Sequence, residues 1–384
     1  MSKSLDQIEQ NAEGRPLRVL YLMAFTDRAE SESIIAMAQR GVRPTVICSP
    51  DAGMRERMEQ AGVEVIPLPL RANVDRDSIA AMRALLQERE FDLVHALYKK
   101  TLCNFTLAAR GLRRPPMVAY RGIIGNLSYW DPLSWLSFLN PRIERIICVC
   151  EAIRQYFLHK RFLLGFHLFK PQRVVTIYKG HRPEWYRGSA DRSALRALGI
   201  ADEAPVIGCV ARLKKRKGIV ELIQAFEQLP GELNAHLVLV GTVEYPAIEA
   251  AARNSSAAER IHLLGFRRDA PALAGAFDII TLPSLRREGL PRAIIEAMAQ
   301  GVPAMVSDSG GNPELVEDGK SGRVTPAGDV AAMREALRQM VADRELRARL
   351  GEGAARRIAE DFSIERTVEK TLALYQEVLA EAKP

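Results

Sequence analysis

The stretch PSLRREGLPRAIIEAMAQGVP, residues 283–303, is the most informative about the fold. An apolar run at 279–282 precedes it and another at 304–307 follows it, and both are typical of buried strands. Between them, Pro291 suits the first position of a helix and Gly301 suits its C-terminal cap. The spacing therefore predicts a strand, a loop, a helix of about three turns and a second strand, as in a parallel α/β sheet.

The same alternation runs through both halves of the chain, on either side of a region at 179–189 rich in Gly, Pro and charge. Before it we expect strands at 17–24, 44–49, 63–67, 91–96, 116–120, 143–149 and 174–178. After it we expect strands at 206–211, 235–240, 261–264, 279–282 and 304–307, and helices from 330 onward. This pattern predicts an α/β protein with two doubly wound, Rossmann-like domains facing a cleft, where ligands bind at the carboxyl ends of strands. The expected domains are 1–188 and 189–384, with the last helices packing back on the first domain.

Composition narrows the classes of protein. The 384 residues suffice for two α/β domains, and 47% apolar with 26% charged residues is typical of a globular protein. The sequence contains no run of about 18 apolar residues, so we expect no membrane-spanning helix. The polar N-terminal segment 1–16 does not resemble a secretion signal, so we expect a cytoplasmic protein.

Charge and cysteine usage limit the partners. The net charge of +7 favours an anionic partner, but no nucleic-acid-binding module surrounds the short basic clusters, so we expect no nucleic acid. The five cysteines are scattered, mostly in strand-like runs, and none has a His or Cys partner at metal-ligand spacing. We therefore expect buried reduced thiols.

The loop and helix within 283–303 carry two carboxylates. Glu288 lies just before the expected helix, and Glu296 lies about two turns further along it. A carboxylate accepts hydrogen bonds from vicinal hydroxyls, such as those of a sugar or a ribose. Gly289 and Leu290 lie where free backbone N–H groups favour a phosphate. Two solvated glutamates around an ordinary amphipathic helix remain the alternative.

Two further loops follow predicted strands. Arg212 and Lys217 follow the strand at 206–211, where a guanidinium fork and a point charge would suit a diphosphate. The residues between them, 214–216, are expected to form a solvated basic loop. Gly310 and Gly311 follow the strand at 304–307 and allow close approach of the backbone to a ligand, although alone they fit a plain turn.

Together these segments resemble the retaining glycosyltransferases of family 4, which have the two-domain GT-B fold. The resemblance is specific over about 206–326. It rests on the Glu, seven residues, Glu pattern at 288–296, the Arg and Lys five apart at 212 and 217, and the Gly-Gly-x-Pro-Glu turn at 310–314. In addition, LLGFRRD at 263–269 resembles the family's strand and loop beside the nucleotide base.

The resemblance implies a mechanism. Arg212 and Lys217 would neutralise the donor diphosphate as it leaves, and Glu288 would contact the donor sugar. Retention of anomeric configuration, with neither metal nor cofactor, is implied as well. Further donor contacts would fall on Glu296, Gly289, Leu290, Gly311 and Phe266.

The N-terminal half departs from the family. Members often have a Gly-Gly loop after the first strand, but here that loop reads AFTDRAES, 24–31. Many members have a histidine after a later strand, where this chain has Arg121. Arg121 and His95 are therefore the acceptor-side candidates, with a structural role the stronger expectation for His95.

Two aromatic segments, LSYWDPLSWLSFLN at 127–140 and YFLHKRFLLGFHLFK at 156–170, fit either a membrane interface or packing against the core. We expect transfer of a hexose-type sugar from a nucleotide-diphosphate donor to a glycan or glycolipid in cell-envelope polysaccharide or lipopolysaccharide synthesis, at the inner face of the membrane if these segments contact lipid. Two alternatives remain: a nucleotide-sugar-binding protein without turnover, and a nucleotide-sugar epimerase or phosphorylase on the same fold.

Overall fold

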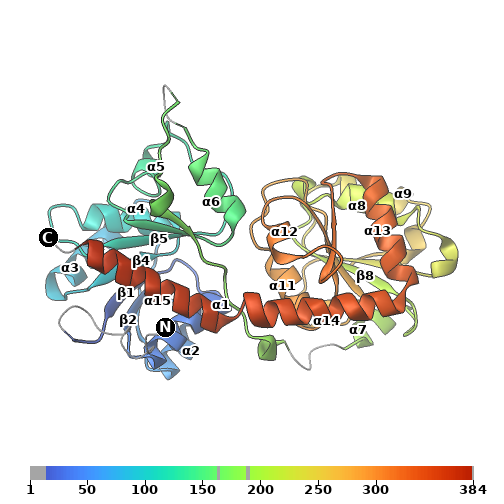
Figure 1. Cartoon of the computed structure of the whole chain (residues 1–384), viewed down its shortest axis with the longest axis horizontal. Coiled ribbons are helices and arrows are strands. Elements are labelled where there is room, and N and C mark those ends of the chain that lie inside the picture. The colour runs from blue at the N-terminus through green and yellow to red at the C-terminus, as the bar shows by residue number, and fades with distance from the viewer. Residues whose placement is uncertain (1–13, 162–164, 187–190, 383–384) are drawn as a thin grey trace, which may run out of the picture. The chain divides into compact units, whose positions relative to one another are not determined.

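The computed structural model describes residues 14–161, 165–186 and 191–382, which divide into two compact units. The first unit holds the chain up to Gly180 and from Ile364 onward, and the second holds His181–Ser363. Each unit is a parallel sheet flanked by helices (Figure 1), which confirms the expected class of two doubly wound α/β domains. The expected boundary between residues 188 and 189 lies outside the described residues, as does most of the N-terminal segment 1–16.

The first unit contains a seven-stranded sheet of order β3-β2-β1-β4-β5-β6-β7. Every neighbouring pair in it is parallel. Strands β4 and β6 are buried along their whole length, because helices cover both faces of the sheet. The strands are β1 (Arg18–Leu22), β2 (Arg43–Cys48), β3 (Glu64–Pro67), β4 (Leu93–Ala96), β5 (Met117–Arg121), β6 (Arg145–Cys148) and β7 (Val174–Thr176).

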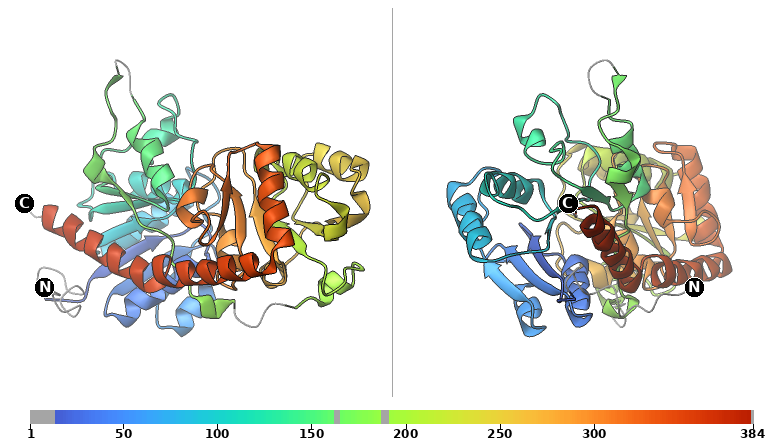
Figure 2. Two further views of the ribbon diagram at one scale, coloured as in Figure 1. Left: turned by 45° about the vertical axis from the view of Figure 1, so that its right-hand side comes forward. Right: turned by 60° about the vertical axis from the view of Figure 1, so that its left-hand side comes forward.

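Crossovers between parallel strands are almost always right-handed, which places the helices of such a sheet on both of its faces. On one face α1 packs against α2 and α15, and on the other α3 packs against α4. The last helix of the chain, α15, thus returns to the first unit and lies along α1 (Figures 1 and 2). The helices are α1 (Arg28–Gln39), α2 (Arg55–Gln60), α3 (Arg76–Glu88), α4 (Lys99–Ala108), α5 (Pro132–Trp135), α6 (Glu151–Leu158) and α15 (Ile364–Glu381).

The second unit contains a six-stranded sheet of order β10-β9-β8-β11-β12-β13, also parallel throughout. Its strands are β8 (Val206–Val210), β9 (His236–Val240), β10 (Ile261–Leu263), β11 (Ile279–Leu282), β12 (Ala304–Ser307) and β13 (Gly322–Thr325). Its helices are α7 (Ser193–Arg196), α8 (Ile219–Phe226), α9 (Ala247–Asn254), α10 (Ala270–Gly275), α11 (Arg292–Met298), α12 (Asn312–Leu315), α13 (Val330–Ala342) and α14 (Arg344–Asp361).

Helix α11 is shorter than expected. Pro291 is its N-cap, in an extended conformation with φ −75° and ψ 111°, so the helix begins one residue later and ends at Met298. Gly301 follows it with φ 82°, the left-handed conformation typical of a C-terminal stop.

All five cysteines are buried and free. In the described part of the chain, no helix combines the length and apolar character needed to cross a bilayer.

Candidate active site

Three loops converge at one edge of the sheet in the second unit. The strands β8, β11 and β12 are neighbours in the sheet order and run parallel, so the loops after their carboxyl ends lie side by side. The loop after β8 carries Arg212 and Lys217, the loop after β11 carries Glu288, and the turn after β12 carries Gly310 and Gly311. The strand order therefore gathers residues from segments that are almost 100 positions apart in the chain.

Glu288 is the residue on which these loops meet. Its Oε2 lies 2.8 Å from the Nζ of Lys217, and both side chains are only 10% exposed. The Ser284 hydroxyl donates to the same oxygen at 2.6 Å. A buried carboxylate is costly unless it is paired and hydrogen-bonded, and here it is both. The carboxylate is thus held in a fixed position.

The glycine turn after β12 packs directly on the backbone of Glu288. A Cβ on Gly310 would lie 2.0 Å from the Glu288 carbonyl oxygen, and Gly310 has φ +63°. Only glycine fits both demands without strain. The Gly311 N–H donates to the same carbonyl oxygen at 3.2 Å, so this N–H already has a partner within the protein. The turn therefore holds the Glu288 loop in place through its backbone.

The other residues that we expect to contact the donor differ from Glu288 in exposure and in their partners. Arg212 is exposed, and its guanidinium makes no ion pair or hydrogen bond with the described residues. Glu296 on α11 is buried and pairs with Arg292 at 3.3 Å. The Phe266 ring is 73% exposed in the loop after β10.

Two residues at this site were not among the sequence-based candidates. Ser284 holds Glu288 as described above, and nothing in the sequence distinguishes it from any loop serine. Arg216 was expected to be solvated, but one terminal nitrogen of its guanidinium is buried and lies 3.7 Å from Glu288 Oε2. Lys214 is closer to the expected solvated loop, since its ion pair with Glu244 at 2.7 Å is partly exposed.

Arg121, at the end of β5 in the first unit, is engaged in local contacts. It is 5% exposed, and its guanidinium donates to the carbonyl oxygens of Ile123 (3.0 Å) and Gly125. It also lies 4.6 Å from the centre of the Phe138 ring. Burial lowers the pKa of this guanidinium. These contacts hold the loop after β5.

His95, on β4 of the first unit, is also buried, at 6% exposure. Its Nδ1 lies 2.6 Å from the hydroxyl of Tyr375 on α15, while its Nε2 has no hydrogen-bond partner among the described residues. Burial lowers the pKa of the imidazole to about 3, so His95 is neutral at physiological pH. Arg121 and His95 therefore differ, because His95 retains a free polar atom.

Two family models match the chain, one for each unit. The model described as "Glycosyl transferases group 1" matches residues 191–357, which include all the donor-side residues discussed above. The model described as "Glycosyl transferase 4-like domain" matches residues 32–180.

Characterised relatives cover most of the chain. The lipopolysaccharide core biosynthesis glycosyltransferase LpsE of Rhizobium meliloti is 31% identical over 340 residues, 88% of this chain and 92% of that protein. A GDP-mannose-dependent phosphatidylinositol monomannoside mannosyltransferase of Corynebacterium glutamicum is 32% identical over 321 residues, 78% of each chain. The N-acetyl-alpha-D-glucosaminyl L-malate synthase of Bacillus anthracis matches over a shorter span, 56% of this chain and 57% of that protein, at 28% identity.

Solved structures share the fold. Anabaena HepE in complex with UDP-glucose superimposes with a TM-score of 0.73 at 23% identity, covering 94% of this chain and 99% of that one. A glycosyltransferase from Rickettsia africae gives 0.77 at 16% identity, covering 94% and 98%. The two parallel-sheet domains are thus those of the GT-B fold. With the family models and LpsE, this places the chain in the group 1 glycosyltransferases.

Proposed function

We propose that this glycosyltransferase transfers a hexose-type sugar from a nucleoside-diphosphate donor to a hydroxyl of a glycan or glycolipid, with retention of configuration, as in family 4. The observation that carries the proposal is the convergence of Lys217, Glu288 and the Gly310–Gly311 turn at the carboxyl ends of adjacent strands. Ligands of open α/β sheets bind at such an edge.

The charge of this site suits a diphosphate. The loop after β8 directs Lys217 and Arg216 toward Glu288 and carries the exposed Arg212 beside them. Three cations against one carboxylate leave two positive charges, which match the charge that develops on a departing nucleoside diphosphate. Cations already in place stabilise that charge without reorganisation. Arg212 is open to solvent, so its guanidinium can bind phosphate oxygens in bidentate fashion.

The loops at the carboxyl ends of these strands also provide the remaining donor contacts. Glu288 accepts hydrogen bonds from sugar hydroxyls through its Oε1, since Lys217 and Ser284 contact Oε2, and Glu296 accepts them from the ribose. The N–H groups of Gly289 and Leu290 donate to no protein acceptor in the described chain, so they suit the sugar and phosphates. The Gly311 N–H holds the Glu288 loop instead.

Phe266 supplies an exposed aromatic face for the nucleotide base. Its position after β10 puts it on a loop of the same sheet edge. A flat ring stacks on a base of either kind, so this contact serves purines and pyrimidines alike.

The names of the relatives indicate the acceptor class. LpsE and LpsB of Rhizobium meliloti act in lipopolysaccharide core biosynthesis, and the Corynebacterium enzyme acts on a phosphatidylinositol mannoside. We therefore propose an envelope glycan or glycolipid as the acceptor, made at the cytoplasmic face of the membrane.

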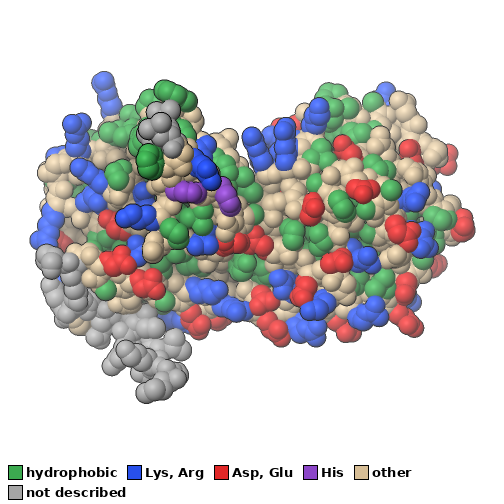
Figure 3. Space-filling model, turned by 45° about the horizontal axis from the view of Figure 1, so that its top comes forward, with side chains coloured by type: hydrophobic (Ala, Val, Ile, Leu, Met, Phe, Trp, Pro, Cys, Tyr) green, Lys and Arg blue, Asp and Glu red, His purple; other side chains and the backbone are tan. Residues whose placement is uncertain are grey.

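A surface of the first unit fits that location. The aromatic patch, defined by Tyr129, Trp130, Trp135, Lys160 and Phe166, joins the two segments singled out in the sequence. The Lys160 ammonium lies 5.3 Å from the centre of the Tyr129 ring, while Trp130 and Phe166 are 86% and 69% exposed. Figure 3 shows hydrophobic and cationic side chains mixed on this face. Exposed aromatics beside cations suit an anionic lipid interface.

A ligand screen followed by product analysis tests the proposal. We expect UDP- or GDP-sugars to raise the melting temperature of the protein, because a specific ligand stabilises the folded state by mass action. Arg212→Ala should weaken that shift, and the exposed Glu249→Gln on α9 should leave it unchanged. Proton NMR of the product should then show the anomeric configuration of the donor. Inversion, or the absence of any nucleotide effect, would count against the proposal.

A further inference from the structure

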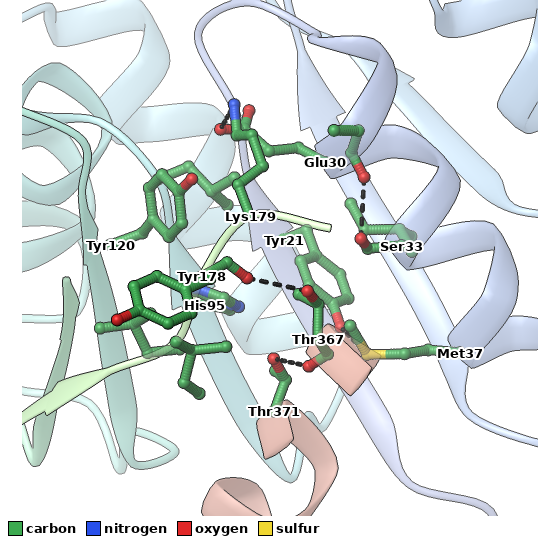
Figure 4. Close-up of a pocket in the computed structure, with 15 residues that line it drawn as sticks. Tyr21, Glu30, Ser33, Met37, His95, Tyr120, Tyr178, Lys179, Thr367 and Thr371 are labelled. Atoms are coloured by element: carbon green, nitrogen blue, oxygen red, sulfur yellow. Dashed lines mark hydrogen bonds and ion pairs between the residues drawn. The ribbon is translucent and has the colours of Figure 1, made fainter. Parts of the chain in front are cut away.

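A pocket inside the first unit is separate from the donor residues, all of which belong to the second unit. It lies between the sheet and helices α1 and α15, with walls from β1, β4, β5 and the segment after β7 (Figure 4). Much of the wall is aromatic or aliphatic, including Tyr21, Ile34, Tyr120 and Ile177. Polar groups enter it at only a few points, which makes each of them informative about what the pocket binds.

A chain of polar contacts holds His95 from one side. Its Nδ1 lies 2.6 Å from the Tyr375 hydroxyl, which lies 3.2 Å from the Tyr21 hydroxyl, and that hydroxyl lies 3.1 Å from the sulfur of Met37. On the other side of the ring, Nε2 is buried and has no hydrogen-bond partner among the described residues. A neutral imidazole nitrogen either donates or accepts one hydrogen bond, and a hydroxyl can be its partner in both cases.

Tyr120 offers a second polar atom to the same pocket. Its hydroxyl is buried and makes no well-formed hydrogen bond with the described residues. Burial and the nearby Glu30 carboxylate raise the pKa of this hydroxyl, so Glu30 is a neighbour that interacts with it weakly. The Tyr120 and His95 rings are neighbours, with their centres 6.3 Å apart. A buried hydroxyl without a well-formed hydrogen bond is costly, so a native protein that retains one commonly uses it.

Lys179, a cationic residue of the pocket wall, is already neutralised by two carboxylates. The Lys179 ammonium lies 2.8 Å from Glu30 and 3.2 Å from Asp27, so this cluster carries one net negative charge. An anionic group would therefore be repelled here. A neutral hydroxyl suits the imidazole, the phenol and the carboxylates alike, since it can both donate and accept a hydrogen bond.

We propose that this pocket binds hydroxyl groups of a neutral sugar, with His95 Nε2 forming a hydrogen bond with one hydroxyl and the Tyr120 hydroxyl with a second. The aromatic walls suit the apolar C–H faces of such a sugar. The inference rests on the proposed function, in that the sugar is a unit of the glycan acceptor. It adds a chemical restriction, because the part of the acceptor that enters this pocket carries no phosphate or carboxylate.

The experiment measures binding of simple probes to the full chain. Methyl α-D-glucopyranoside, methyl α-D-mannopyranoside and methyl α-D-galactopyranoside represent neutral sugars, and inorganic phosphate represents an anion. Dissociation constants are measured by saturation-transfer NMR for the wild type, Tyr120→Phe and Tyr156→Phe. Tyr156→Phe removes a hydroxyl elsewhere in the same unit. Since the Tyr120 hydroxyl makes no well-formed hydrogen bond, Tyr120→Phe should fold with a melting temperature close to that of the wild type.

We expect at least one methyl glycoside to bind the wild type at millimolar concentration and phosphate not to compete with it. Tyr120→Phe should weaken that binding about 3- to 10-fold, the value of one hydrogen bond, while Tyr156→Phe should not. In ¹⁵N-histidine spectra the glycoside should shift the Nε2 resonance of His95. Equal binding by Tyr120→Phe and the wild type, competition by phosphate, or no binding of any glycoside would each overturn the proposal.

The same samples separate this inference from the proposed function. Nucleotide-sugar binding depends on residues of the second unit, so Tyr120→Phe should retain the full nucleotide effect on melting temperature. Glycoside binding without any nucleotide effect would defeat the proposed function and leave the pocket assignment standing. A nucleotide effect without glycoside binding would do the reverse.

Discussion

The Lys217–Glu288 ion pair leads to a prediction whose size follows from burial. Both side chains are 10% exposed and their charged atoms are 2.8 Å apart. Removing one partner of a buried pair costs about 3–5 kcal/mol because the other charge is left buried. In Lys217→Met, Glu288 keeps the Ser284 hydroxyl at 2.6 Å and Arg216 at 3.7 Å. We therefore expect a loss at the lower end of this range, about 3 kcal/mol in the free energy of unfolding.

A double-mutant cycle isolates the pair. Lys217→Met, Glu288→Gln and the double variant are compared with the wild type by urea unfolding followed by circular dichroism. The double variant has no unpaired buried charge, so it should be more stable than the sum of the single changes predicts, by about 1.5–3 kcal/mol. It should nevertheless remain inactive, because both groups serve the donor.

An exposed ion pair provides the control. Arg338 and Glu335 lie 2.7 Å apart but are 46% and 45% exposed, so Arg338→Met should cost no more than about 0.5 kcal/mol. If Lys217→Met costs as little as Arg338→Met, or if the coupling energy is near zero, then the carboxylate is not held by a buried charge pair and the proposed preorganisation of the site is wrong.

Three further predictions use other parts of the chain. Gly310→Ala should lower stability by more than 2 kcal/mol and weaken nucleotide-sugar binding, whereas Gly319→Ala (φ +74°, open space around its Cβ) should cost only about 1 kcal/mol; similar losses would refute the close packing. Trp130→Ser should reduce co-sedimentation with vesicles that contain phosphatidylglycerol at low salt. Val74 is exposed elsewhere on the first unit, so Val74→Ser should not reduce it. A wild type that stays in the supernatant would contradict the membrane proposal. His95 has a folded pKa of about 3, below the 6.5 of the unfolded chain, so the unfolded state binds more protons between these pH values. Stability should therefore fall as the pH drops from 6.5 toward 3, by at most about 1.4 kcal/mol per pH unit. His95→Gln should flatten the pH dependence of the urea-derived stability over that range, and an unchanged slope would show that His95 is not buried in its neutral form.

Most of the sheet could be predicted from the sequence, because a strand covered on both faces is a short apolar run. The elements that were missed lack such a signal. Helix α4, KKTLCNFTLA, is largely buried and so shows no clear helical period, and it begins with two lysines where the helix dipole disfavours cations. Strand β13 begins with Gly322, which is needed because a Cβ there would lie 2.0 Å from the Ala304 carbonyl oxygen.

The candidate site was predictable as far as strand ends determine it. Arg212, Lys217 and Glu288 follow strands directly, so their segments had to meet once β8, β11 and β12 became neighbours. Ser284 and Arg216 lie in irregular loops, where side-chain direction follows no period. Their contacts with Glu288 depend on the folded loop and could not be read from spacing.

A comparison of sugar transfer by the wild type and Glu288→Gln decides whether this site performs the chemistry. The donor is the nucleotide sugar that gives the largest thermal shift, and released nucleoside diphosphate and glycosylated product are both quantified. We expect Glu288→Gln to fold and to bind the free nucleoside diphosphate nearly as the wild type does. Its turnover should fall at least about 100-fold, the usual cost of losing one preorganised electrostatic contact to the transition state. Turnover within a few-fold of the wild type would contradict the assignment of the active site to the Glu288 loop.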